Sequence, residues 1–279
     1  MKIFKKIVLI SILFYFLFCV CVYVKPEWFF YMPYKFAGNI KNAQDDGFAV
    51  KEVVYHEYED IKAKGWLYLN DSPDNNKKVV LFLHGNSYNV ESYYHKLVPF
   101  AQKGYSVFIP EYRGFGGQGN KIRQKNLTQD ALNALFYLNS IGFENKDVVV
   151  YGMSLGSHMA LYTVVNGQEN GDLNALILEV PFTSLQDTVK HHIEFKWIKL
   201  LPLDLLVKDK YNNVELIDKI RTRLLVMTTK SDTLIPYIQA VSLYEKALPP
   251  KDIKIYSGAS HDLLYNLQNY NKIIDWLDK

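Results

Sequence analysis

One stretch of the chain, residues 147–167, limits the possible folds more than any other. A run of apolar, mostly β-branched residues leads into Gly152-Met153-Ser154-Leu155-Gly156 and then into a helix-forming segment. Strand, sharp turn and helix in this order lift the serine hydroxyl clear of the sheet, where it can act as a nucleophile. Only small residues fit at 152 and 156, because bulk there would clash with the neighbouring strand and helix. The stretch therefore predicts a nucleophile elbow with Ser154 at its apex.

The rest of the chain alternates between short apolar runs and amphipathic segments, as in proteins built from parallel βαβ units. The apolar runs predict strands at 50–58, 65–70, 78–83, 105–110, 147–151, 173–180, 223–228 and 252–256. Helices are expected from Asn89 to Gly104, over 128–138, after the elbow, over 236–247 and from His261 onward. The first two strands are able to form an antiparallel entry hairpin. The whole pattern predicts an α/β fold with a mostly parallel central sheet flanked by helices.

The alternation stops at 181–213, after the sixth predicted strand. This insertion is rich in leucine and aromatic residues. Ordinary packing accounts for most of these side chains. The insertion nevertheless lies beyond the carboxyl end of a strand, which is where a small helical cap would cover an apolar pocket.

Two loops supply partners for the serine. Asp232 follows the strand after the insertion and precedes a helix that begins near Pro236, while His261 follows the last strand in a loop of small residues. The carboxyl ends of parallel strands meet at one edge of a sheet, so both side chains are expected beside Ser154. The order Ser, Asp, His matches a nucleophile, acid and base triad. Glu179, at the end of the strand after the elbow, is the next candidate for the acid.

The segment His84-Gly85-Asn86 directly follows a predicted buried strand and completes the candidate site. The backbone N–H groups of Asn86 and Leu155 are expected to form an oxyanion hole, in which each donor contributes roughly 3 kcal/mol to transition-state stabilisation. Glycine at 85 lets the backbone approach the substrate. His84 is expected to brace this loop by hydrogen bonds rather than to titrate during catalysis.

Composition excludes several other functions. The chain has 32 basic and 29 acidic residues and carries a net charge of +3, without a polybasic stripe, so we expect no nucleic-acid partner. The histidines do not pair with carboxylates at metal-site spacing, and both cysteines, Cys19 and Cys21, lie in the apolar N-terminal run. No metal and no cofactor are therefore expected.

The N-terminal run at 7–24 contains eighteen residues without a charge. That length meets the minimum for a membrane-spanning helix, and Trp28 and the aromatic residues after it suit the membrane interface. A cleavable signal peptide is the alternative, but it requires small residues before the cleavage point, where this chain has Val22-Tyr23-Val24. Three lysines precede the run and Lys25 follows it. We therefore expect an uncleaved anchor, and the lysine bias predicts its N-terminus in the cytoplasm and the remainder of the chain on the other side.

These motifs together resemble the α/β-hydrolase fold, and within it the membrane-anchored α/β-hydrolase-domain proteins related to eukaryotic protein depalmitoylases and their bacterial counterparts. The resemblance extends from about Tyr31 to the C-terminus. It rests on Gly65-Trp66, His84-Gly85-Asn86, Tyr112-Arg113-Gly114-Phe115-Gly116, Gly152-Met153-Ser154-Leu155-Gly156, Pro181-Phe182-Thr183-Ser184, the run from Leu205-Leu206 to Tyr211, Asp232 to Pro236 and Gly258 to His261. It implies Ser154 as nucleophile, Asp232 as acid and His261 as base.

The chain departs from the family pattern at three places outside the triad. The usual Asp-Tyr-Arg-Gly is Glu111-Tyr112-Arg113-Gly114, the usual His-Gly before the acid loop is Thr228-Thr229, and a glycine usual after the elbow is Ser157. Each change bears on the shape of the pocket.

The predicted organisation is a cytoplasmic N-terminus at 1–6, a transmembrane signal anchor at 7–24, a juxtamembrane connector at 25–48 and a hydrolase domain at 49–279. The predicted activity is cleavage of an ester or thioester with an apolar acyl part, through an acyl-enzyme, with a small molecule, a lipid or an acylated protein as substrate. A serine peptidase of prolyl-oligopeptidase type and a non-catalytic scaffold that binds a lipid or partner remain alternatives.

Overall fold

The computed structural model describes residues 2–70, 78–119, 122–168, 171–191, 202–258, 260–263 and 267–279. Its centre is an eight-stranded sheet in the order β10-β9-β8-β7-β4-β6-β3-β2. The strands are β2 Lys51–Tyr58, β3 Ile61–Tyr68, β4 Val79–Leu83, β6 Ser106–Pro110, β7 Val148–Met153, β8 Ala175–Glu179, β9 Leu224–Thr229 and β10 Lys251–Tyr256. Only the pairs β2–β3 and β3–β6 are antiparallel. The predicted entry hairpin and parallel sheet are confirmed.

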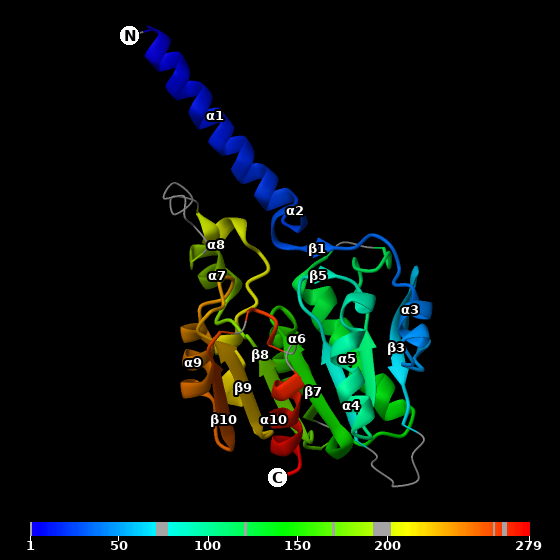
Figure 1. Cartoon of the computed structure of the whole chain (residues 1–279). Coiled ribbons are helices and arrows are strands. Elements are labelled where there is room, and N and C mark those ends of the chain that lie inside the picture. Colours follow the sequence, from blue (N-terminus) through cyan, green and yellow to red (C-terminus); the bar gives the residue numbers. More distant parts are fainter. Residues whose placement is uncertain are drawn as a thin grey trace.

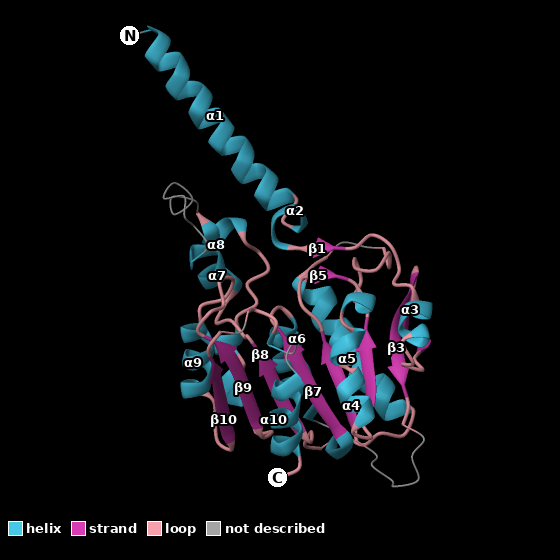
Figure 2. Ribbon diagram, viewed as in Figure 1, coloured by secondary structure: helices cyan, strands magenta, loops and turns pink. Residues whose placement is uncertain are grey.

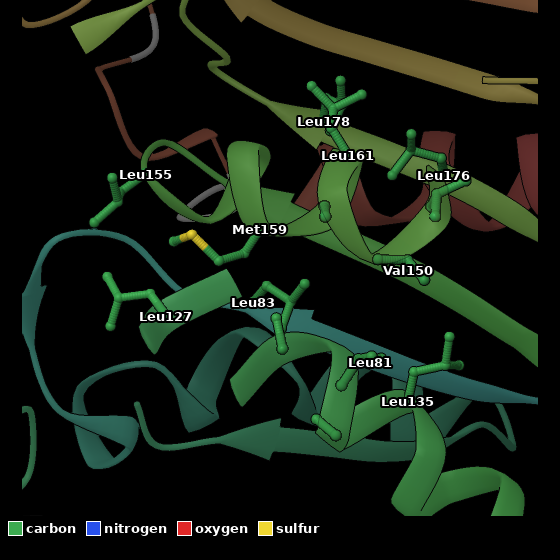
Figure 3. Packing of buried hydrophobic residues seen from close by; sticks show 14 of the residues in the cluster. Leu81, Leu83, Leu127, Leu135, Val150, Leu155, Met159, Leu161, Leu176 and Leu178 are labelled. Carbon is green, nitrogen blue, oxygen red and sulfur yellow. The ribbon is translucent and has the colours of Figure 1, made fainter. Parts of the chain in front are cut away.

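Helices cover both faces of this sheet (Figures 1 and 2). They are α4 Val98–Gln102, α5 Gln124–Ser140, α6 Gly156–Gly167, α9 Tyr237–Lys246 and α10 Leu267–Leu277. Alternate residues of each central strand enter different cores: Leu81 packs in the core that contains residues of α5, α6 and α9, and Val80 packs with residues of α4 and α10. Figure 3 shows the first core, with Leu81, Val150 and Leu176 beside Leu135 and Leu161. Strands buried on both faces read as continuous apolar runs, which is why the sequence revealed them.

Three helix predictions differ from the structure in their bounds. The helix expected from Asn89 to Gly104 is divided into the 3-10 helices η1 Val90–Ser92 and η2 Tyr94–Lys96 and the short α4. Pro99 explains the break, because proline lacks an N–H and its ring clashes with the preceding turn of a helix. Helix α5 begins four residues earlier than expected, and the last helix begins at Leu267 rather than at His261.

The described part of the insertion at 181–213 consists of two short helices and loops. It contains α7 Leu185–His191 and α8 Leu203–Leu206, and residues 192–201 lie outside the described residues. Asn213 ends the insertion and is fully buried, and its side-chain amide donates a hydrogen bond to the Phe182 carbonyl. Both ends of the insertion are thus tied together above the sheet.

The N-terminal helix α1, Lys2–Val24, projects away from the sheet (Figure 1). Its mean hydropathy is 2.9 and 6% of it is buried, so its length and composition suit a membrane span. Its last turns meet the insertion, where Val22 packs with Leu206 and Val207. The segment that follows contains α2 Glu27–Phe30, the two-residue strand β1 Met32–Pro33 and α3 Ile40–Asp45. Strand β1 pairs in parallel with β5, Ser87–Tyr88, beside the predicted oxyanion loop.

Candidate active site

The elbow has the strained geometry that the sequence predicts. Ser154 lies between β7 and α6 with a φ of 52°, a left-handed value that non-glycine residues rarely adopt. Its N–H donates to the carbonyl of Glu179 on the next strand, at 2.9 Å. A Cβ on Gly152 would lie 2.6 Å from the Cβ of Ala160, and one on Gly156 would lie 1.9 Å from the Leu83 carbonyl oxygen. The steric reason for both glycines is therefore confirmed.

Asp232 and His261 form a hydrogen-bonded pair across the ends of β9 and β10. The Nδ1 of His261 lies 2.7 Å from Oδ2 of Asp232, whose side chain is fully buried. The other oxygen of Asp232 accepts from the N–H groups of Leu234 and Ile235, at 2.7 and 2.9 Å. Burial would raise the pKa of Asp232, but the hydrogen bonds from His261 and the two N–H groups outweigh it and hold that pKa below its ordinary value. An ionised Asp232 fixes Nδ1 as the donor and leaves Nε2 free to accept a proton.

Ser154 and His261 line one cavity of about 820 Å³, together with Gly85 and Asn86. Among the residues that the structure describes, the Ser154 hydroxyl makes no hydrogen bond with His261. Hydrogen bonds between a nucleophile and its base are commonly long in sites without substrate.

Glu179, the alternative acid, is engaged elsewhere. Its carboxylate is fully buried and accepts from the N–H of Leu263 at 2.8 Å and from the hydroxyl of Tyr151 at 3.0 Å. Burial raises its pKa, even though the nearby Lys96 ammonium acts in the opposite direction. Lys96 is itself buried and pairs with Asp262. These contacts hold the loop on the carboxyl side of His261, so the Glu179 carboxylate binds the backbone next to the candidate base.

The predicted oxyanion loop, His84-Gly85-Asn86, lies against the elbow. A Cβ placed on Gly85 would lie 3.7 Å from the Ser154 Cβ, so the two backbones are in close approach. Within the described part of the chain, the N–H groups of Asn86 and Leu155 have no hydrogen-bond acceptor. Free, fixed N–H groups beside a nucleophile are what an oxyanion hole requires.

His84 lies at the start of this loop and packs against its neighbours. Its ring is fully buried between the rings of Tyr93 and Tyr112, its Nδ1 is 2.9 Å from the Gly85 carbonyl, and its Nε2 is 3.3 Å from Oε1 of Glu111. Glu111 also accepts from the N–H of Val90, which follows the oxyanion loop. The glutamate that replaces the family's aspartate therefore reaches the histidine of the oxyanion loop.

The walls of the cavity are largely apolar. They include Leu185 and Val189 of α7, Leu234 and Ile235 of the acid loop, and Phe30 of α2. A second, smaller pocket of about 70 Å³ also borders Ser154 and is lined by Leu155, Phe182 and Tyr211 among others. The structure thus supplies apolar surface on more than one side of Ser154. The part of 181–213 that is described contributes to both pockets.

The connector contributes to the cavity, which the sequence did not indicate. Phe29, Phe30 and Met32 line the larger cavity, although they precede the elbow by more than a hundred residues. A run of aromatic residues after an apolar helix is typical of a membrane interface, so the linear pattern carries no separate signal for a cavity wall. His158, by contrast, is buried as a structural residue: its ring nitrogens bond to Asn213 and Gln124. No group of three or more His, Cys, Asp or Glu side chains suited to a metal is found among the described residues.

A mostly parallel sheet with a serine elbow at the carboxyl end of a central strand defines an α/β-hydrolase-fold serine hydrolase. The sequence model of the serine aminopeptidase S33 family, Hydrolase_4, matches residues 74–214, half of the chain. The chain belongs to this family.

The chain is also similar to individual proteins. It is 28% identical over 229 residues to the uncharacterized protein Rv2307c of Mycobacterium tuberculosis, covering 81% of this chain and 77% of that protein. It is 27% identical over 213 residues to the rat lysophosphatidylserine lipase ABHD12, covering 71% of this chain and about half, 52%, of the lipase. Among solved structures, the esterase Pf2001 of Pyrococcus furiosus superposes with a TM-score of 0.70 at 20% identity, covering 90% of this chain and 97% of the esterase. The latter likeness is one of fold.

Proposed function

We propose that the protein is a membrane-anchored esterase or thioesterase that works through an acyl-enzyme on Ser154. The observation that carries the proposal is the hydrogen bond between Asp232 and His261 at the wall of the cavity that Ser154 also lines. In this mechanism Nε2 of His261 takes the proton from the serine hydroxyl as the oxygen attacks the acyl carbonyl. Asp232 stabilises the imidazolium that forms, and the N–H groups of Asn86 and Leu155 bind the oxyanion.

Acylation is completed when the imidazolium of His261 gives its proton to the leaving alcohol or thiol and the C–O or C–S bond of the substrate breaks. In the second half, a water molecule attacks the acyl-serine as the imidazole takes one of its protons. The bond between the acyl carbon and the serine oxygen then breaks, the imidazolium returns the proton to that oxygen, and the acid leaves. An apolar acyl group suits the walls formed by Phe30, Leu185 and Val189. The lipase named among the relatives is consistent with this class of substrate.

Two alternatives remain open to test. The family is described as a serine aminopeptidase family, so amide cleavage is the second candidate. A scaffold that binds a lipid or partner without catalysis is the third, and it is disfavoured by the intact set of Ser154, Asp232 and His261. Rates with p-nitrophenyl esters of increasing chain length, with acyl thioesters and with aminoacyl amides separate these candidates.

The decisive experiment treats the detergent-solubilised full-length chain with a fluorophosphonate, which reacts with activated serines. We expect labelling of the wild type and none of Ser154→Ala. Ser157→Ala is the matched control, since Ser157 is fully buried one turn away and should not affect labelling. Asp232→Asn should lower kcat by about 10³ to 10⁴, because a triad acts as one unit. An unlabelled wild type, or equal labelling of Ser154→Ala, would refute the assignment.

Topology is a separate part of the proposal. Lys2, Lys5 and Lys6 precede the apolar helix and Lys25 follows it, so we propose that the hydrolase domain lies on the non-cytoplasmic side. A C-terminal reporter that is active only outside the cytoplasm should be active. An inactive reporter would show that the domain lies in the cytoplasm. An intact mass that lacks the first two dozen residues would show that the apolar helix is a cleaved signal peptide and not an anchor.

A further inference from the structure

The connector between the apolar helix and the hydrolase domain holds both sides of Asn86. The side-chain amide of Asn86 donates to the carbonyl of Phe30 at 3.1 Å, and the carbonyl of Asn86 accepts from the N–H of Met32 at 2.9 Å. A further bond, from the N–H of Tyr34 to the carbonyl of Tyr88, continues the β1–β5 pairing at 2.9 Å. Pro33 lies between the two donors, at a position of the ladder where no N–H is needed.

The connector is itself fixed to the body of the domain. Glu27 forms an ion pair with Arg123 at 3.0 Å, just before α5. The ring of Tyr31 is buried, and its hydroxyl is 2.7 Å from that of Tyr211 at the end of the insertion. The segment that holds Asn86 is therefore fixed to the domain at two places. Glu27 lies before Phe30, and Tyr31 lies between Phe30 and Met32.

We propose that residues 29–34 are a positioning element of the oxyanion hole. The proposal rests on the function proposed above, because it assigns the Asn86 N–H to the oxyanion. That N–H has no acceptor of its own within the described chain, so its direction depends on how the rest of the residue is held. Bonds to the carbonyl and to the side chain fix the residue at two points and leave the N–H free to donate into the cavity.

The arrangement gives the connector two roles. Phe30 supplies a wall of the cavity and the acceptor for Asn86, and it also packs beside Val22 of the apolar helix and Leu206 of the insertion. Phe30 thus contacts the end of the apolar helix, the insertion and the oxyanion loop. The connector is therefore part of the active site. The same segment joins the hydrolase domain to the apolar helix.

Two asparagines of the same loop provide a matched test in the full-length protein. Asn86→Ala removes the bond to Phe30, and Asn89→Ala removes the corresponding bond from an asparagine amide to the connector carbonyl of Phe36, at 3.2 Å. Displacement of an oxyanion donor by about 1 Å should lower kcat roughly tenfold to a hundredfold. We expect that loss in Asn86→Ala, with KM nearly unchanged, while Asn89→Ala retains the wild-type kcat.

A transition-state analogue separates positioning from general destabilisation. A trifluoromethyl ketone forms an oxyanion when the serine adds to it, so its affinity for Asn86→Ala should fall by the same factor as kcat/KM. Met32→Pro leaves Asn86 intact but removes the N–H that holds its carbonyl, and should show the same loss with a folded protein by circular dichroism. Equal kcat in Asn86→Ala and Asn89→Ala, or a change in KM alone, would overturn the proposal. An inactive, unlabelled wild type would instead refute the function on which it rests.

Discussion

Replacement of Gly156 by alanine tests whether the active-site geometry depends on the close packing of the elbow against the oxyanion loop. The added Cβ would lie 1.9 Å from the Leu83 carbonyl oxygen and 2.7 Å from that of His84. Both are backbone atoms, at the end of β4 and the start of the oxyanion loop, and neither can rotate away. Because ordinary carbon–oxygen contacts are about 3.3 to 3.6 Å, helix α6 and this loop must separate by roughly 1.4 to 1.7 Å.

The separation moves the nucleophile away from Asn86. A misplacement of about 1 Å costs on the order of 10² in rate, and overpacking of this kind costs about 1 to 3 kcal/mol of stability. We expect Gly156→Ala to lose about 10² or more in kcat and about 3 kcal/mol in the free energy of unfolding, since the clash is with backbone. Ester hydrolysis and the rate of fluorophosphonate labelling measure the first, and urea unfolding measures the second.

Gly142 provides the control for this substitution. It has a φ of +103°, and a Cβ there would meet nothing within 4 Å. Gly142→Ala should therefore cost only backbone strain, about 1 to 2 kcal/mol, and leave kcat as in the wild type. A Gly156→Ala protein with normal labelling and esterase rates would refute the reasoning, because it would show that α6 and the oxyanion loop move without effect on the site.

Two further predictions concern buried polar groups outside the candidate active site. Arg113 pairs with fully buried Asp130 at 2.7 Å, so Arg113→Met should lower the free energy of unfolding by about 3 to 5 kcal/mol, and adding Asp130→Leu should restore part of that loss. If the double variant is no more stable than the single, an unpaired carboxylate is not the cause. Burial lowers the pKa of His158 to about 4. A lowered histidine pKa contributes stability that is present above about pH 6.5 and is lost as the pH falls towards 4. The free energy of unfolding of the wild type should therefore fall by about 2 kcal/mol between pH 7 and 5 because of this residue. His158→Gln, compared by urea unfolding at both pH values, should lack that part of the loss, and an unchanged pH dependence would show that His158 is not its source.

The sequence by itself determined the sheet, the elbow and the order of the three candidate site residues. Strands buried on both faces must be continuous apolar runs, and a serine between Gly152 and Gly156 after such a strand has few other places to lie. Once the sheet is parallel, its strands end at one edge, and Asp232 and His261 are brought together by topology alone. Helix bounds were less well predicted, because Pro99 and the surrounding packing, rather than periodicity, divide the segment after Asn89.

Only the tertiary structure decided what surrounds the three candidate site residues. The hydrogen bonds of Asn86 to Phe30 and Met32 join residues more than fifty positions apart, and no local pattern encodes such a pairing. The same holds for Glu179, which a linear reading offered as an acid and which the fold uses to hold the backbone of Leu263. Periodicity reports which side of an element is buried, whereas the partner across a cavity depends on how distant loops pack, and that is set only when the whole chain is folded.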